Sequence, residues 1–174
     1  MSTRRFPAWI ASALAIIPCA RGAQPWDEPF SKDPRAIAAA AQQIKRPDNP
    51  GVIVLLDEYR YLIHSDGRTD LTHRKVYRVT QQDAVEEWSS AEQGYQPWHQ
   101  KKPDIRARVI GPEGDAHSLD AKTVADAPAG DVDATIFSDA RLVRAPLPSV
   151  SAGSVVEYEI AVQDSAPLLS LIHI

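Results

Sequence analysis

Four side chains between residues 88 and 99 are the best candidates in this sequence for chemistry beyond packing. They are Trp88, Tyr95, Trp98 and His99, and they lie in a stretch without a clear secondary-structure period. Aromatic side chains on a connecting segment can form a docking surface for another domain or a stacking platform for sugar rings. They can equally fill the end of a fold and fix a long connection. Neither role makes them a catalytic centre.

The histidines near residues 64 and 73 suggest a metal pair, but their spacing argues against one. His64 and His73 flank an Asp-Gly turn signal. On the paired strands predicted below, His64 faces Thr69, which leaves the two histidines four residues apart along the sheet, or about 13 Å. Two ligands of one zinc ion cannot be that far apart. We therefore interpret both as surface histidines.

A second polar group surrounds residue 117. Asp115, His117 and Asp120 could form an acid–base or metal cluster, and Ser118 is adjacent to His117. A serine nucleophile also requires an orienting group and an oxyanion site, which adjacency in sequence does not supply. Polar residues beside a turn more often set its geometry. We expect no metal ion, no cofactor and no catalytic residue in this chain.

The only cysteine, Cys19, lies in an N-terminal leader. A single cysteine excludes an internal disulfide, a CxxC pair and a zinc site built from cysteines. Residues 1–23 have the basic start, the short apolar run (Phe6–Ile17) and the small residues of a secretory signal peptide. The apolar run is too short to span a bilayer. We predict export to the periplasm or the extracellular space, with a lipid anchor at Cys19 as the alternative.

Loss of this leader would make the chain more acidic. The 174 residues carry 19 Lys and Arg against 23 Asp and Glu, for a net charge of −4, and residues 1–23 contain three arginines and no acid. Removing those three positive charges takes the net charge to −7. An acidic surface argues against nucleic acid and against anionic membranes as partners once the leader is gone.

One helix is expected, over residues 31–44. Asp33 is a good N-cap, Pro34 suits the first helical position, and Ile37 and Ala41 belong to an apolar stripe. The two aromatic residues Trp26 and Phe30 precede the helix, and we expect them to pin the start of the mature chain to the body.

The strongest strand signal is Asp66-Gly67 between the apolar runs at 52–63 and 71–80. This pattern predicts a β-hairpin, in which we take these two residues as the whole loop. The expected pairs are Leu62 with Leu71, Glu58 with Lys75, Leu56 with Tyr77, and Val54 with Val79. Each pair is apolar or oppositely charged, as a strand ladder favours.

The remaining chain predicts short strands at 105–109, 117–119, 134–137, 140–143 and 156–162. Residues 81–102 are interpreted as one long connection and 120–133 as a loop. Short strands with one helix predict a mainly β fold, an antiparallel β-sandwich-like domain over residues 26–167.

Residues 169–174 match one reading frame of a transposase sequencing adaptor. We interpret them as a non-native tail on an N-terminal fragment; the alternative is a genuine apolar strand.

Several segments in a fixed order resemble a known family. They are Trp88-Ser89-Ser90, Tyr95, Pro97-Trp98-His99-Gln100, Ile105–Ile110, Phe137-Ser138-Asp139, Arg144–Pro148 and Gly153–Glu157. Together they resemble the uncharacterised β-rich domain found N-terminal to transglutaminase-like domains in secreted bacterial proteins. The resemblance implies a papain-like Cys-His-Asp domain downstream. This chain cannot supply that triad, because the thiolate is the nucleophile and its only cysteine is in the leader.

The sequence therefore predicts a non-catalytic exported domain that packs against or positions a downstream transglutaminase-like domain. The alternative is a cell-envelope module that binds glycan or peptide through the stretch from Trp88 to Trp98. An enzyme in its own right is least expected, because the chain shows no complete catalytic constellation.

Overall fold

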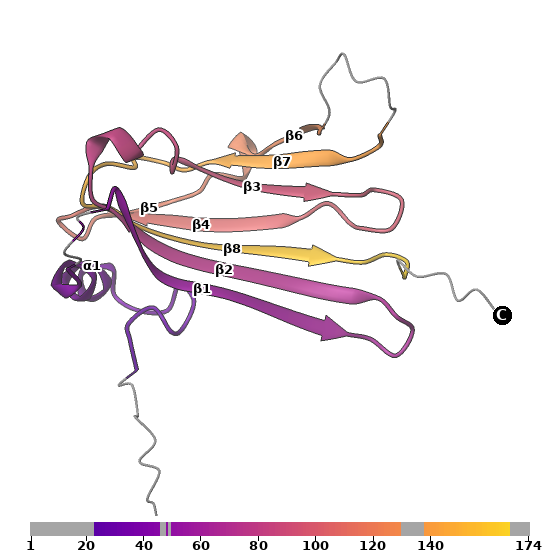
Figure 1. The fold of residues 1–174 in the computed structure, drawn as a ribbon, viewed down its shortest axis with the longest axis horizontal. Coiled ribbons are helices and arrows are strands. Elements are labelled where there is room, and N and C mark those ends of the chain that lie inside the picture. Colours follow the sequence, from indigo (N-terminus) through magenta and orange to yellow (C-terminus); the bar gives the residue numbers. More distant parts are fainter. Residues whose placement is uncertain (1–22, 46–47, 49, 130–137, 168–174) are drawn as a thin grey trace, which may run out of the picture.

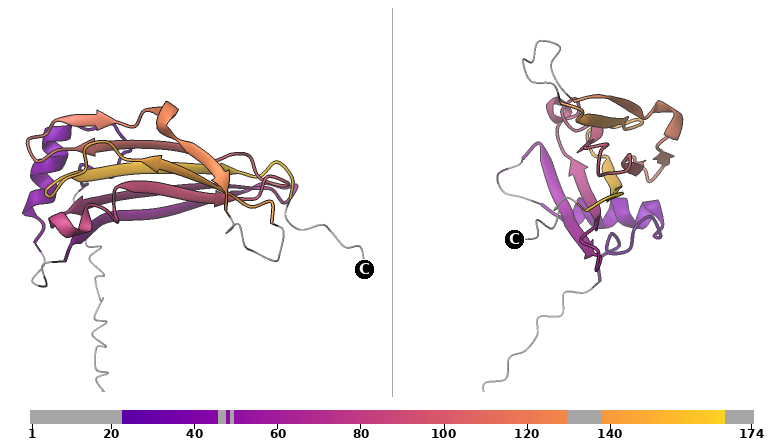
Figure 2. Two further views of the ribbon diagram at one scale, coloured as in Figure 1. Left: turned by 90° about the horizontal axis from the view of Figure 1, so that it is seen from above. Right: turned by 90° about the vertical axis from the view of Figure 1, so that its right-hand side faces the viewer.

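The computed structural model describes residues 23–45, 48, 50–129 and 138–167, and in them two antiparallel sheets form layers (Figures 1 and 2). This confirms the predicted mainly β, sandwich-like fold. The leader, the strand at 134–137 and the tail at 169–174 lie outside the described residues. The elements are α1 (Pro34–Gln43), β1 (Val52–Ile63), β2 (Thr69–Val79), the 3-10 turn η1 (Gln82–Ala84), β3 (Ser90–Tyr95), β4 (Asp104–Ile110), β5 (Ala116–Ser118), η2 (Ala121–Thr123), β6 (Ala125–Pro128), β7 (Arg141–Pro146) and β8 (Val155–Gln163).

The larger sheet has the strand order β1-β2-β8-β4-β5, and the smaller sheet has the order β3-β7-β6. The central strand β8 alternates in the way the sequence predicts, so that Val156, Ile160 and Val162 lie in the core between the sheets. Ala91 of β3 and Val143 of β7 complete that core from the smaller sheet. Alternation along a strand thus places every second β8 side chain in the main hydrophobic core.

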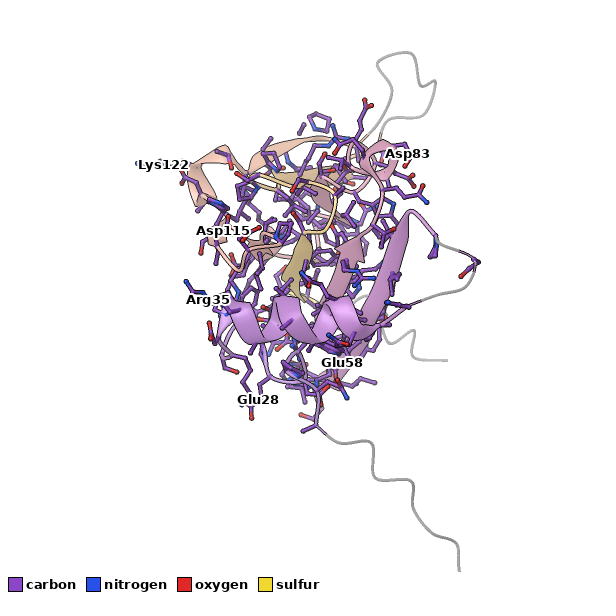
Figure 3. The ribbon with its side chains drawn as sticks, turned by 90° about the vertical axis from the view of Figure 1, so that its left-hand side faces the viewer. Glu28, Arg35, Glu58, Asp83, Asp115 and Lys122 are labelled. Atoms are coloured by element: carbon purple, nitrogen blue, oxygen red, sulfur yellow. The ribbon has the colours of Figure 1, made fainter. Side chains whose placement is uncertain are left out.

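The predicted helix is confirmed and covers the larger sheet at one end (Figure 3). Asp33 is its N-cap and accepts a hydrogen bond from the backbone N–H of Arg35, with Pro34 at the first helical position. Ile37 and Ala41 are fully buried. They belong to a second apolar cluster with Trp26, Ala38, Val76, Ile110 and Val155.

Charged side chains fasten the segment before α1 to the same face of the sheet. Glu157 is 1% exposed; its carboxylate accepts the backbone N–H of Phe30 at 2.7 Å and lies 2.6 Å from the Arg108 guanidinium. Arg74 is also buried and donates to the carbonyls of Trp26 and Asp27. The prediction that Trp26 and Phe30 pin this segment to the body is confirmed.

The β1–β2 hairpin is present, but its predicted register is wrong by one residue or more. The observed partners are Leu62 with Asp70, Glu58 with Arg74, Leu56 with Val76, and Val54 with Tyr77, with an irregularity between Val54 and Leu56. The turn explains the difference. His64 donates its N–H to the Arg68 carbonyl around a three-residue loop, in which Gly67 has a φ of 84°. Such loops end in a left-handed residue and shift the pairing relative to a two-residue turn.

Two segments predicted as connections contain strands. The stretch 81–102 includes η1 and β3, and the stretch 120–133 includes η2 and β6. Both strands lie in the smaller sheet, where they pair with either edge of β7. β6 has only exposed or half-buried residues, and β3 buries only Ala91 and Tyr95. Strands that bury so few side chains need no alternation of apolar and polar residues, so the sequence shows none.

Candidate functional site

The end of the sandwich opposite α1 brings together three distant parts of the chain. The turn between β1 and β2, the connection from β3 to β4 and the end of β8 all lie at the right-hand end of Figure 1. A cavity of about 320 Å³ opens there. Its apolar lining includes Tyr61, Leu71 and Val162, and its polar lining includes Gln93, His99 and Asp164.

Two of the four predicted aromatic and imidazole side chains lie at this end of the domain, and one of them, His99, lines the cavity. The Trp98 and His99 rings have centroids 4.0 Å apart, with Trp98 57% exposed and His99 only 5% exposed. The His99 carbonyl accepts the backbone N–H groups of Ser165 and Ala166, at 2.7 and 3.2 Å. The β3–β4 connection is therefore hydrogen-bonded to the chain just after β8. Among the side chains that the structure describes, His99 Nδ1 is the one buried polar atom without a hydrogen-bond partner.

Exposed apolar side chains also lie at this end of the domain. Tyr61 is 63% exposed and Ile63 is 73% exposed, both close to the hairpin turn. The last described residue, Pro167, lies beside this turn, with its Cβ 3.4 Å from where a Cβ on Gly67 would be. We call Tyr61, Ile63, Trp98 and the cavity-lining His99 the distal surface.

The other two predicted residues lie elsewhere. Trp88 is half-buried against Tyr77, with ring centroids 5.0 Å apart, and its carbonyl accepts the Tyr77 hydroxyl at 2.8 Å. Its ring also lies 5.2 Å from the Lys75 ammonium. Trp88 thus stabilises the segment that leads from the larger sheet to the smaller one.

Tyr95 belongs to the core, and its hydroxyl makes a polar contact at the edge of the core. It is 8% exposed, and its hydroxyl donates to Asp126 at 3.1 Å, while Arg141 donates to the other oxygen of that carboxylate at 2.8 Å. Burial, followed by the hydrogen bond with Asp126, raises the pKa of Tyr95. Burial would raise the pKa of Asp126 as well, but the hydrogen bonds from Arg141 and Tyr95 outweigh it and lower that pKa.

A cluster on the hairpin was missed by the sequence reasoning, and the interpretation of His73 as a surface residue is wrong. His73 is 8% exposed, its Nε2 lies 2.8 Å from Asp57 Oδ1, and its ring stacks on Tyr59 with centroids 4.0 Å apart. Lys75 lies 3.4 Å from the second Asp57 oxygen. These residues alternate on adjacent strands. The correct register would therefore have placed Asp57 opposite Lys75 and Tyr59 opposite His73.

Asp57 orients the His73 ring, but the contacts of this pair among the described residues include no suitable nucleophile. A carboxylate-oriented imidazole is a general base in many enzymes. The remaining ring contacts of His73 are Tyr59 and Tyr158. Burial, with a smaller effect of Asp57, raises the pKa of Tyr158 to about 12. A phenol with that pKa is protonated at neutral pH and is a poor nucleophile.

The histidines do not share a metal site in the described ranges. His64 has its own carboxylate, Asp70, at 3.1 Å, separate from the Asp57 partner of His73. No group of three His, Cys, Asp or Glu side chains among the described residues could hold a metal ion.

The polar residues near 117 serve local geometry. His117 and Asp115 form an exposed pair at 2.9 Å. Asp120 caps η2 by accepting the Lys122 N–H, and Ser118 is exposed.

Within the part of the chain that the structure describes, no helix is long and apolar enough to cross a bilayer.

The fold and these contacts define a small two-sheet β domain with an open, partly apolar end. The profile of a domain of unknown function, DUF3857, matches residues 65–171, and the chain belongs to that family. Its fold is also similar to the crystal structure of a "putative protease" from Parabacteroides distasonis ATCC 8503, with a TM-score of 0.60 at 11% identity. The similarity covers 67% of this chain and 23% of that one, so this chain corresponds to a small part of that protein. No curated protein matches the chain.

Proposed function

We propose that this domain is a non-catalytic, exported module that docks and positions a further domain attached after β8. The observation that carries the proposal is the position of Pro167. Pro167 lies at the hairpin turn, against Gly67, and the exposed Tyr61, Ile63 and Trp98 of the distal surface lie at the same end of the domain. A domain that continues from Pro167 would meet this surface first.

The composition of the distal surface suits a docked domain. Exposed aromatic and apolar side chains beside a cavity are typical of the buried centre of an interface. Fully burying each large side chain contributes about 1.5–3 kcal/mol. A tethered domain is also present at a high effective concentration, so a small contact area suffices to hold it.

Two further observations support a longer parent protein. The similar part of the Parabacteroides chain is 23% of its length, so the fold occurs there within a much longer protein. The sequence also resembles domains that precede transglutaminase-like domains. The only cysteine here is Cys19, so a Cys-His-Asp triad of the parent would come from the attached domain. The predicted leader provides the export.

The test begins with the native reading frame beyond Pro167. We expect it to encode a domain with its own cysteine, histidine and aspartate. In the two-domain protein, Trp98→Ala should loosen docking and speed protease cleavage after Pro167. Val54→Ala is the matched control, because Val54 is also exposed, at 42%, but lies at the other end of β1. A frame without a further domain would contradict the proposal, as would a cleavage rate that Trp98→Ala leaves unchanged.

Binding of an envelope glycan or peptide is the second candidate, and the cavity favours it. Trp98 offers an exposed ring, and His99 Nδ1 offers a buried polar atom without a partner. Stacking on Trp98 beside the cavity would suit a sugar ring. A pull-down on cell-wall glycan with the Trp98→Ala variant as the comparison tests this. Binding that does not depend on Trp98 would exclude it.

A further inference from the structure

Strand β1 is a long edge that lacks two of the usual protections against pairing. It has 12 residues and lies at the end of the larger sheet, where no strand of the described chain pairs with its outer side (Figure 2). The sequence Val52–Ile63 contains no proline and no lysine, which are common protections of edge strands. The pairing with β2 is regular from Leu56 to Ile63, because its irregularity lies before Leu56.

The exposed apolar side chains gather on this strand. Among the described residues, six large apolar side chains are exposed, and five of them lie on β1. These five are Val54, Tyr59, Tyr61, Leu62 and Ile63. An edge that combines free backbone groups with exposed apolar side chains is a template for a further strand.

The hydrogen-bond pattern shows which residues would pair. His64 donates its N–H toward β2, to the Arg68 carbonyl. In an antiparallel pair, alternate residues point their backbone groups to the same side. Residues 62, 60 and 58 therefore point toward β2 as well, and Tyr61, Tyr59 and Asp57 point their N–H and C=O groups outward.

The charges on β1 favour a second copy of the same strand as the partner, and they also favour one register for the pairing. If a second copy of β1 pairs antiparallel with Tyr59 opposite Tyr59, Glu58 of each copy faces Arg60 of the other. Shifting the pairing by two residues in one direction sets Glu58 against Glu58, and in the other direction Arg60 against Arg60. Opposite charges stabilise directly facing pairs and like charges destabilise them. Of these three registers, only the one with Tyr59 opposite Tyr59 is complementary in charge.

We propose that two copies of this domain associate through β1, antiparallel and with Tyr59 opposite Tyr59, so that the two larger sheets become one continuous sheet. This contact uses one patch on both copies, as two-fold symmetric dimers do. It also covers an exposed apolar side chain: Leu62, 59% exposed, faces Leu56 of the second copy. Leu56 packs beside the α1 cluster, so Leu62 would extend a cluster that already exists.

Single-cysteine variants test the register directly. The full 174-residue chain with Cys19→Ser has no other cysteine. Adding Tyr59→Cys places two thiols on facing residues with Cα atoms about 5.5 Å apart, which is within the range of a disulfide. Adding Tyr61→Cys instead places the two thiols about 13 Å apart along the strands. We expect rapid formation of a covalent dimer under mild oxidation for Tyr59→Cys only.

Charge reversal provides an independent test without cysteine. Arg60→Glu removes both cross-copy attractions and should raise the dissociation constant of the dimer at least tenfold in analytical ultracentrifugation. Arg68→Glu makes the same charge change at the turn, where Arg68 pairs with Asp66, and should leave dimerisation unchanged. Circular dichroism confirms that each variant is folded. A monomeric chain at all concentrations would overturn the proposal, as would equal cross-linking of both cysteine variants. Neither measurement involves a domain after Pro167, so this inference is tested separately from the docking proposal.

Discussion

Replacing Glu157 by alanine should lower the free energy of unfolding by about 3–5 kcal/mol, the usual loss when one partner of a buried ion pair is removed. Glu157 is 1% exposed and lies 2.6 Å from the Arg108 guanidinium, whose side chain is 12% exposed. Its other oxygen accepts the Phe30 backbone N–H at 2.7 Å. Alanine would leave a nearly buried cation without this carboxylate and a backbone N–H without its acceptor. The second effect alone is worth about 1–3 kcal/mol and is part of the total.

Urea unfolding at pH 7, followed by tryptophan fluorescence, measures this loss. Glu157→Gln keeps an acceptor for Phe30 and should lose less than Glu157→Ala. Glu92→Ala is the matched control, because Glu92 pairs with Arg144 at 2.7 Å but the pair is exposed. Exposed pairs contribute about 0–1 kcal/mol. If Glu157→Ala lost no more than Glu92→Ala, the segment before α1 would not be held over Glu157 in solution.

Three further changes test other contacts. Gly114 has a φ of 85°, and a Cβ there would clash with Arg35 Cγ. Gly114→Ala should therefore lower the unfolding free energy by about 1–3 kcal/mol in urea, whereas Gly94→Ala should change it little. The lowered pKa of Asp126 means that its contribution is present above the ordinary aspartate pKa and is lost as the pH falls through the folded value. Asp126→Asn should therefore lose more stability at pH 7 than at pH 3, and an equal loss would contradict this. Trp98→Ala should alter stability by less than about 0.5 kcal/mol because the ring is exposed, and a larger loss in urea would show that the ring is a core residue.

The sequence was sufficient for the fold class and for elements with local signals. The helix had a capping residue, a proline and an apolar stripe, and Asp33 and Pro34 take their predicted positions. The hairpin had strong strand patterns, but the turn type was not determined by Asp66-Gly67 alone. Both two- and three-residue loops accept a glycine in the left-handed region. The charges did not resolve the choice, since Glu58 meets a cation, Lys75 or Arg74, in either register.

The missed features all depend on contacts between distant residues. β3 and β6 are strands because β7 pairs with them, and no alternation in their own residues marks this. His73 is buried because Tyr59 stacks on it from the neighbouring strand, which only the correct register shows. Trp98 and His99 are adjacent in sequence and remain neighbours in the fold. Their position near the end of the described chain depends on β8, because the residues just after β8, Ser165 and Ala166, donate hydrogen bonds to the His99 carbonyl.

Three carboxylates of the domain are already bound by groups of the chain itself. Glu157 interacts with Arg108 and Phe30, Asp57 interacts with His73 and Lys75, and Asp126 interacts with Tyr95 and Arg141. The buried polar atom that lacks a partner within the described ranges, His99 Nδ1, lies at the distal surface. The opposite end of the domain is closed by α1 and Trp26. The unpaired His99 ring nitrogen and the exposed Tyr61 and Trp98 therefore occur at the same end of the domain as Pro167, which is the surface that the proposed attached domain would contact.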